Sequence, residues 1–361
     1  MKLTPRQSEA LDALSRHDNY ADAAAEMGIT ESRVRGLMCE ARQRLQVDSD
    51  EEWVVPAVNE RYNPETGQWN PTTRRRVFRP RAMTADDITR AVADAKVKPV
   101  KARKAPAMRG KDPLILDQVL FGDMHIGMLA HHEEAGMNWD TDISVRVHRE
   151  AAEYLLSEGM GTHARITTIG DTTHANDQTN ATPRSKHQLD CDSRHYRTLR
   201  AAIELFEHMT EFALQTHETV ELDFVEGNHD PTATIALRLA LWARYRNEPR
   251  VFVDTSPAEY RIKMWGACGI GTTHSDKATI KRLPLIYCTE YPEFAAAKCK
   301  DIWGGHKHSV HTFEDRGVLV ELLRTLAPRD AHAAKAGYLA GRSATVVSYH
   351  QETGRVNRAW Y

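Results

Sequence analysis

The sequence predicts a layered α/β domain over residues 112–361, preceded by a small all-α domain. Up to His308, apolar strand-like runs alternate with amphipathic helical stretches, and hairpin-like runs follow. Near the N-terminus, three short helical stretches are separated by turn signals. We therefore expect a helical domain over residues 1–46, a connector over residues 47–111, and the α/β domain over residues 112–361.

Residues 4–46 have the pattern of three short helices. Thr4-Pro5-Arg6-Gln7 has the spacing of a capping box, with proline at the first helical position. A second helix is expected from Tyr20 to Met27, closed by Gly28, and Thr30 is the expected N-cap of the third. In the third helix, apolar residues recur with helical period and form one apolar side: Val34, Leu37, Met38, Ala41 and Leu45. Three arginines lie away from that side: Arg33, Arg35 and Arg42.

A short helix, a glycine-containing turn and a basic helix resemble the helix-turn-helix of LuxR-type regulators and of sigma-factor region four. The resemblance implies that Ser32, Arg33 and Arg35 stand at the start of a recognition helix and bind DNA. The alternative is a three-helix interaction module whose arginine face is solvated.

Charge is distributed unevenly along the chain. Residues 1–111 carry 21 Lys and Arg against 16 Asp and Glu, whereas residues 112–361 carry 27 against 34. The positive excess is concentrated in residues 72–111, and it favours a polyanionic partner. A solvated basic linker would have the same composition. Within the connector, the turn signal from Asn63 to Gly67, between Tyr62 and Trp69, is compatible with a small hairpin.

Composition excludes several classes of protein. At 41% apolar and 27% charged residues the chain is ordinary globular protein, and no apolar run approaches the length of a membrane span. The N-terminus lacks the apolar core of a signal peptide. The five cysteines form no C-x-x-C and are expected to be free thiols. We expect a cytoplasmic protein without membrane contact.

Elements of the α/β domain are expected in a regular order. Helices are expected over residues 142–158, 196–215 and 232–246, and strands over residues 114–121, 165–169, 220–225, 301–303, 310–313, 318–322, 344–349 and 356–360, with two more between 260 and 273. The ends of such strands collect the active site in a layered α/β domain.

Polar residues follow five of these strands. Gly227-Asn228-His229-Asp230 comes after the run from Val220 to Val225; Asn228 offers an oxygen to a metal, and His229 can exchange a proton near neutral pH. Asp230-Pro231 has the pattern of a helix N-cap followed by proline. The other four stretches place His, with or without Asp, directly after a strand: Gly122-Asp123-Met124-His125, Gly170-Asp171-Thr172-Thr173-His174, Thr272-Thr273-His274 and Gly304-Gly305-His306-Lys307-His308.

Hydrolysis of a phosphodiester without a covalent intermediate needs a hydroxide at neutral pH, neutralised phosphoryl charge and a stabilised leaving oxygen. Two metal ions supply all three, with oxygen and imidazole ligands. The five stretches offer that mixture, and we expect the glycines to let the backbone turn sharply where a ligand approaches.

The order D-x-H, G-D, G-N-H-D, H and G-H-x-H resembles that of the calcineurin-like metallophosphoesterase superfamily, over Asp123 to His308. The resemblance implies a β-sandwich flanked by helices, with two divalent ions. It implies one metal on Asp123, His125 and His308, a second on Asn228, His274 and His306, and a bridging Asp171 that shares the nucleophilic hydroxide. It also implies that His229 contacts the phosphate and protonates the leaving oxygen. We expect Mn(II), although Fe, Zn or Ni would fit the same ligands.

His174 bears on the substrate. Superfamily members that act on phosphoproteins continue G-D with Asp and then Arg-Gly, which this chain lacks. A histidine three residues after the aspartate is similar to SbcD-like exonucleases, where it helps place the phosphodiester and supports the catalytic histidine. The chain lacks their large DNA-capping region and is also similar to phosphoesterases encoded by bacteriophages. The polar loop after His174, with Arg184, Lys186, His187 and Arg194, either binds flanking phosphates or is a mobile surface loop.

The sequence therefore predicts a metal-dependent hydrolase of DNA, an exonuclease in the first interpretation. Two alternatives remain open: a small-nucleotide phosphodiesterase or phosphatase with a regulatory N-terminal domain, and a DNA-binding regulator with an inactive phosphoesterase domain. DNA is the expected partner, and a homodimer is compatible with the sequence. His131, His132, His163 and His332 have no motif context and are expected at the surface.

Overall fold

The computed structural model describes residues 110–337 and 339–361 and, before them, residues 4–6, 9, 10, 13, 20–30, 32–34, 37, 59–63 and 68–73. The chain divides into two compact units, Met1–Met83 and Thr84–Tyr361, and each is described by itself. The predictions for Arg35, Arg42 and the basic runs of the connector lie outside the described residues, as does the side chain of His332.

In the first unit, helix α2 (Tyr20–Glu26) is followed by Gly28, whose φ of 63° places it in the left-handed region. The Arg33 amide donates to Thr30 Oγ1 at 3.3 Å, so Thr30 is the N-cap that the sequence predicts. Small and aliphatic side chains are buried together: Ala10, Ala13, Ala23, Ala24, Met27, Val34 and Leu37. Strands β1 (Asn59–Asn63) and β2 (Gln68–Thr73) form an antiparallel hairpin that pairs Tyr62 with Trp69.

The second unit contains a six-stranded sheet ordered β13-β12-β3-β4-β5-β6. Its strands are β3 (Asp112–Phe121), β4 (Gly161–Ile169), β5 (Thr219–Val225), β6 (Val251–Val253), β12 (Thr345–His350) and β13 (Gly354–Trp360). The four strands from β3 to β6 run parallel to their neighbours, whereas β12 pairs antiparallel with both β3 and β13. The carboxyl ends of β3, β4 and β5 therefore meet at one edge.

A five-stranded sheet ordered β10-β11-β9-β8-β7 packs against the first. Its strands are β7 (Arg261–Trp265), β8 (Cys268–Thr273), β9 (Cys299–Gly304), β10 (His311–Asp315) and β11 (Val318–Leu322). The hairpins expected after His308 are present, but β11 also pairs in parallel with β9, and β12 crosses to the other sheet. Strands β8 and β9 are parallel, so their carboxyl ends also lie together.

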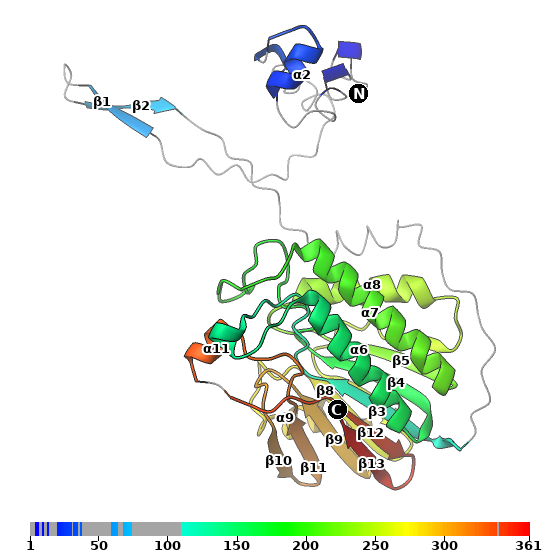
Figure 1. The fold of residues 1–361 in the computed structure, drawn as a ribbon. Helices are drawn as coiled ribbons and strands as arrows, with labels where there is room; N and C mark the ends of the chain where they lie inside the picture. Colours follow the sequence, from blue (N-terminus) through cyan, green and yellow to red (C-terminus); the bar gives the residue numbers. More distant parts are fainter. Residues whose placement is uncertain are drawn as a thin grey trace. The chain divides into compact units, whose positions relative to one another are not determined.

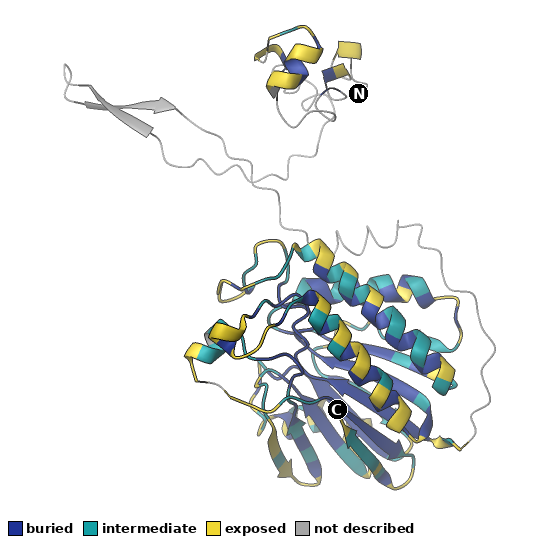
Figure 2. Ribbon diagram, viewed as in Figure 1, coloured by how far each residue is buried: buried dark blue, intermediate teal, exposed yellow. Residues whose placement is uncertain are grey.

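Helices cover both outer faces, as Figure 1 shows. The long helices α6 (Thr141–Glu158), α7 (His195–Thr216) and α8 (Pro231–Tyr245) lie across the six-stranded sheet and bury one side against it (Figure 2). Helices α9 (Leu283–Glu290) and α10 (Pro292–Ala296) pack on the five-stranded sheet through Tyr287 and Phe294. Two short helices, α5 (His132–Ala135) and α11 (Ala331–Lys335), complete the unit. The predicted layered α/β fold is confirmed.

Between the sheets the core has an apolar part and a charged part. The apolar part holds Leu120, Ile169, Ile270 and Trp303, among others. The charged part is built on β5, where Val220, Leu222 and Phe224 face the helices while Glu221 and Asp223 face the other sheet and pair with arginines. The run from Val220 to Val225, interpreted from the sequence as an apolar strand, thus alternates, with its acidic residues facing the other sheet.

Helix α8 begins with an arrangement the sequence does not predict. Asp230 occupies the N-cap position, but its side chain makes no capping bond; it accepts instead from the Thr173 and Gly227 amides at 2.9 and 3.1 Å. The helix is capped by Asn176, whose Oδ1 accepts from the Thr232 amide at 2.7 Å and the Ala233 amide at 3.3 Å. Asp230 is thereby released to bind the two loops that carry polar residues.

Replacing Asn176 with alanine is expected to lower the free energy of unfolding by about 0.5–2 kcal/mol, because two amides of α8 lose their acceptor. Urea denaturation followed by circular dichroism measures the change. Asn176→Asp keeps the acceptor oxygen and should stay near wild type. Equal losses of stability in both variants would show that the acceptor oxygen of residue 176 is not what stabilises the helix.

Two further observations concern the described part of the chain. No helix within it is long and apolar enough to cross a membrane. The cysteines resolved there, Cys191, Cys268, Cys288 and Cys299, are free thiols, as the sequence predicts.

Candidate metal centre

The polar stretches that follow five strands converge at the carboxyl edge of the two sheets. Asp123 and His125 follow β3, Asp171 and His174 follow β4, Asn228 and His229 follow β5, His274 follows β8, and His306 and His308 follow β9. The loops are tied to one another: the His125 amide donates to the Asp171 carbonyl at 2.9 Å, and the His174 amide donates to the Ile126 carbonyl at 2.9 Å. Residues up to 185 positions apart in the sequence thus share one site.

The first ligand set consists of Asp123, His125 and His308, whose ligand atoms lie within 4.8 Å of one another. The Nε2 atoms of His125 and His308 are 3.1 Å apart, and His308 Nε2 is 3.4 Å from Asp123 Oδ1. Both oxygens of Asp123 also accept from the His306 amide, at 2.9 and 3.0 Å. Burial and the neighbouring His229 and His308 hold the pKa of His125 well below its usual range, so its ring is neutral and able to bind a cation.

The second ligand set consists of Asp171, His274 and His306, with Asn228 beside it. His274 Nδ1 donates to the Ile169 carbonyl at 2.8 Å, which leaves Nε2 as the ligand atom. That Nε2 lies 3.0 Å from Asn228 Oδ1 and 3.2 Å from Asp171 Oδ2. Three acceptors face one another, and only a cation or a proton between them relieves the repulsion. The donor set therefore fits divalent metal ions.

The raised pKa of His274 reflects the same demand for positive charge. Burial opposes its protonation, but the carboxylates of Asp171 and Asp123 outweigh that effect and raise its pKa to about 10. His308 behaves similarly: Asp123 outweighs burial and raises its pKa. Without a bound cation, both rings therefore bind a proton more readily than a free imidazole, in the places where the ligand sets need positive charge.

The ligand residues have unusual backbone conformations. Five of them have a positive φ: Asp123 at 39°, His125 at 46°, Asp171 at 48°, His306 at 69° and His308 at 52°. Such conformations of non-glycine residues cost roughly 1–3 kcal/mol each and persist only where the surrounding structure holds them. This strain is concentrated at the strand ends where the two ligand sets form.

The motif glycines provide space for the ligands. A Cβ on Gly227 would lie 2.0 Å from Asp171 Oδ1, and one on Gly305 would lie 2.7 Å from Asp123 Oδ2. A Cβ on Gly170 would lie 2.3 Å from His274 Nδ1. Of the motif glycines, Gly170 has a positive φ, at 82°, whereas Gly227 and Gly305 do not. The three glycines thus stand where candidate ligands approach closely, and at Gly170 the left-handed backbone adds a conformational reason for glycine.

His229 and His174 lie against the first ligand set. The amide of His229 donates to Asp171 Oδ1 at 2.8 Å, and its Nδ1 donates to the His174 carbonyl at 2.9 Å. These bonds fix the ring and leave Nε2 for a substrate. His174 is itself buried, with its ring stacked on His229 at 5.4 Å and its Nδ1 3.2 Å from His125 Nδ1. It therefore contacts the rings of both His229 and His125.

The site has a buried base and an accessible rim. Asp123, His125, Asp171 and His274 are buried, whereas Asn228, His229, His306 and His308 are partly exposed. The side chain of His308 is 40% exposed. A substrate would therefore approach from the side of this rim.

Other residues singled out from the sequence lie elsewhere. Ser32 and Arg33 are exposed on the first unit. Of the histidines without a motif, His131 and His132 are exposed as expected, whereas His163 is less exposed than expected. It is half-buried, with its Nδ1 2.7 Å from Thr219 Oγ1 and its ring 5.1 Å from Trp265. Arg184, Lys186, His187 and Arg194 are exposed on the loop between His174 and α7.

Two supporting residues were missed by sequence reasoning. Asp230 joins the β4 and β5 loops from a buried position, as described above. Thr325 donates to the Asp123 carbonyl at 2.6 Å and holds the first ligand loop. The acidic residue after Asn-His was visible in the sequence, but nothing around Thr325 marked it.

Structural comparison finds solved chains that resemble this one at low scores. A predicted phosphoesterase from Streptococcus pneumoniae TIGR4 has a TM-score of 0.31 at 12% identity, over 68% of this chain and 97% of that one. Vps29 from Entamoeba histolytica, solved with zinc, has a TM-score of 0.29 at 12% identity, over 68% and 98%. Vacuolar protein sorting 29 from Cryptosporidium parvum has a TM-score of 0.31 at 16% identity, over 68% and 97%. No family model and no curated protein matches the sequence. At these TM-scores the similarities carry no argument about the function of this chain.

Proposed function

We propose that this chain is a metal-dependent phosphoesterase of the calcineurin-like superfamily, that it holds two divalent ions, and that it hydrolyses DNA from an end. The observation that carries the proposal is the convergence of two ligand sets, Asp123–His125–His308 and Asp171–His274–His306 with Asn228, on one strand edge. Manganese is the expected metal, because mixed carboxylate, amide and imidazole ligands suit it.

Divalent ions bound there would supply Lewis acidity, neutralising phosphoryl charge and lowering the pKa of water. The chain's own residues provide the rest. Asp171 of the second set accepts from the His229 amide, which fixes the position of that ring. His229 Nδ1 donates to the His174 carbonyl at 2.9 Å, which orients the ring so that Nε2 can donate a proton to the leaving oxygen.

Three features support DNA as the substrate. The connector from residue 72 to residue 111 carries 13 basic and 3 acidic residues. Arg33 is exposed just after the cap of the helix that the sequence predicts to bind DNA. The loop between His174 and α7 starts in the site and exposes Arg184, Lys186 and Arg194.

A substrate panel tests the proposal. Purified protein loaded with Mn(II) is given end-labelled single- and double-stranded DNA, bis-p-nitrophenyl phosphate and cyclic nucleotides, with and without chelator. We expect DNA to shorten progressively from an end and the chelator to stop it. Hydrolysis of cyclic nucleotides without DNA degradation would favour the small-nucleotide enzyme, and inactivity on the whole panel would favour the regulator.

His229→Ala is expected to retain its metal and to lose about 10²–10⁴-fold in kcat on DNA, the usual contribution of a positioned acid. The loss should be smaller for p-nitrophenyl esters, because their leaving group needs no proton. Steady-state kinetics on both substrates measure the ratio, and the exposed His131→Ala is the control. Equal losses on the two substrates would rule out the acid role.

Replacing Ser32, Arg33 and Arg35 together with alanine is expected to weaken DNA binding without changing hydrolysis of bis-p-nitrophenyl phosphate. Each lost arginine–phosphate contact should reduce the slope of log K against log salt by about 0.9. Fluorescence anisotropy at several salt concentrations measures that slope. A variant of the two exposed arginines of α6, Arg146 and Arg149, controls for lost charge. Identical slopes for all three proteins would exclude these residues from the DNA interface.

A further inference from the structure

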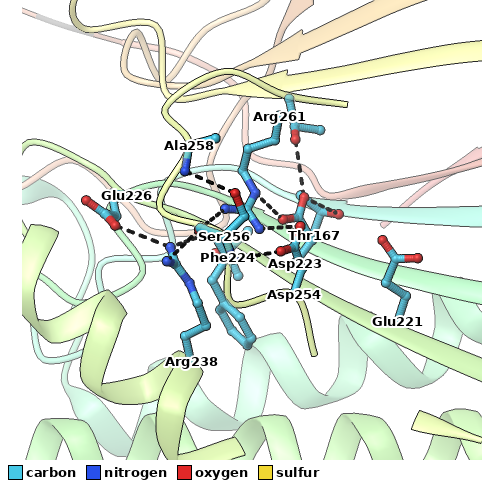
Figure 3. Close-up of polar contacts among 12 residues, drawn as sticks. Thr167, Glu221, Asp223, Phe224, Glu226, Arg238, Asp254, Ser256, Ala258 and Arg261 are labelled. Carbon is cyan, nitrogen blue, oxygen red and sulfur yellow. Dashed lines mark hydrogen bonds and ion pairs between the residues drawn. The ribbon is translucent and has the colours of Figure 1, made fainter. Parts of the chain in front are cut away.

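A layer of buried charge lies between the sheets, behind the candidate metal centre. Its centre is Asp223 of β5, whose side chain is inaccessible to solvent (Figure 3). Asp223 Oδ2 accepts from Arg165 Nη2 at 2.7 Å, and Oδ1 accepts from Arg261 Nε at 2.5 Å. A buried ion cluster of this kind is stable only when every charge is paired with good geometry. The cluster therefore fixes the relative positions of the strands that contribute to it.

Asp223 is joined to the strand that carries His274. Thr272 Oγ1 of β8 donates to Asp223 Oδ2 at 3.2 Å, and His274 is the second residue after Thr272. Alternate strand residues point to the same face, so both side chains project toward the six-stranded sheet. This bond crosses between the two sheets next to the second ligand set.

Asp223 is also joined to the ends of β4 and β5. Thr167 of β4, four residues before Asp171, is paired with Asp223 in the sheet, and its Oγ1 is 3.5 Å from Oδ2. Arg261 donates to the Ser256 carbonyl at 2.7 Å, and Arg238 of α8 donates to the same carbonyl at 2.9 Å. Arg238 also donates to the Phe224 carbonyl at 2.8 Å, four residues before Asn228 (Figure 3).

The first ligand set is tied to this layer less directly. Strand β3, which carries Asp123 and His125, does not contact Asp223 itself but reaches it through Gln118, whose Oε1 accepts from Arg165 at 3.3 Å and whose Nε2 donates to Thr167 Oγ1 at 2.7 Å. Strand β9, which carries His308 of the first set and His306 of the second, takes no part in the contacts of the cluster among the described residues. The cluster thus contacts the strands of Asp171, Asn228 and His274 more directly than those of the first set.

We infer that Asp223 is a positioning residue for the second metal: it fixes the separation of β4, β5 and β8 and so brings Asp171, Asn228 and His274 to coordinating distance. The inference rests on the proposed function and adds a role for a residue that touches neither metal nor substrate. Removing its charge loosens the second ligand set and leaves the first nearly intact.

Metal titration of the full chain tests this. Apo protein is titrated with MnCl₂ in a calorimeter, and the two binding phases are assigned with His125→Ala, which removes a first-set ligand, and Asn228→Ala, which removes a second-set ligand. In Asp223→Asn we expect the phase that is lost in Asn228→Ala to weaken by about 10–100-fold, the range for residues that orient ligands. The phase lost in His125→Ala should be unchanged.

A second variant covers the case in which Asp223→Asn does not fold, because it leaves two buried arginines facing a neutral amide. Thr272→Val keeps the ion pairs and removes one hydrogen bond to Asp223. It should weaken the same phase. The control is Lys263→Met, which removes an ion pair with Glu221 at the edge of the same layer and should lower Tm without changing either phase.

Two results would overturn the inference: both phases weakening together in the folded variants, or neither phase changing in Thr272→Val. A merely structural role predicts a lower Tm with the ratio of the two affinities unchanged. If wild-type protein takes up no metal at all, the proposed function itself fails, and that outcome is distinct from a failure confined to Asp223.

Discussion

Asp171→Asn is expected to lose hydrolysis of every substrate while the protein stays folded. Both oxygens of Asp171 are in use: Oδ1 accepts from the His229 amide at 2.8 Å, and Oδ2 faces His274 Nε2 at 3.2 Å. An asparagine would withdraw the negative charge from the second ligand set. Its NH₂ group would also have to face either the His229 amide, which is itself a donor, or His274 Nε2. Because one positioned electrostatic group contributes about 10²–10³-fold, we expect a loss of about 10³-fold or more.

Turnover of bis-p-nitrophenyl phosphate and of DNA measures this loss, together with the metal content of the dialysed protein and its circular dichroism spectrum. Asp190→Asn, an exposed aspartate on the loop before α7, is the matched control and should behave as wild type. Full turnover by purified, metal-loaded Asp171→Asn protein would refute the mechanism.

The ligand positions could be predicted because their signals are local. A strand that ends in glycine followed by Asp or His can be recognised without knowing its neighbours, and parallel strands collect their carboxyl ends at one edge. Asp123, Asp171 and His274 therefore appear in the structure where the sequence puts them, beside one another and buried. Their division between two metals came from a family resemblance and stays a prediction.

Features that depend on long-range pairing were missed. Asp230-Pro231 has the local pattern of a cap, yet Asn176, 54 positions earlier, takes that role. Nothing in the sequence near Asn176 distinguishes it from other polar loop residues. The run from Val220 to Val225 was interpreted as apolar because its four apolar residues outnumber Glu221 and Asp223. The arginines that pair with these acidic residues, Arg165 and Arg261, lie on strands distant in the sequence.

Short elements were also missed, for a different reason. Strand β6 has three residues and helix α10 has five, so neither is long enough to show a period. Helix α9 packs on the five-stranded sheet, but its apolar residues are not confined to one side. It therefore shows no amphipathic stripe by which the sequence could reveal it. None of these elements supplies a ligand, so their absence from the prediction left the site intact.

The second large loss of activity is expected from a substitution at Gly227. Gly227→Ala is expected to lose metal at the second ligand set and hydrolysis of every substrate, although it adds one methyl group. That methyl would lie 2.0 Å from Asp171 Oδ1 and 2.2 Å from the Asp171 amide nitrogen, and neither the backbone nor the bound carboxylate can give way freely. Overpacking of this kind costs roughly 1–3 kcal/mol of stability. Metal content, turnover and thermal denaturation measure the result.

Space rather than backbone freedom should set the order of effects among these glycines. Gly227 and Gly341 both lack a positive φ, but the Cβ of an alanine at Gly341 would meet only the Arg324 side chain, at 3.1 Å, which can move aside. Gly341→Ala should therefore keep both metals. Gly305→Ala, whose Cβ would lie 2.7 Å from both Asp123 Oδ2 and the Ile169 carbonyl, should fall between them and weaken the first ligand set instead. If Gly227→Ala turned over substrate like Gly341→Ala, the close approach of the loop after β5 would not be what holds the Asp171 carboxylate in place.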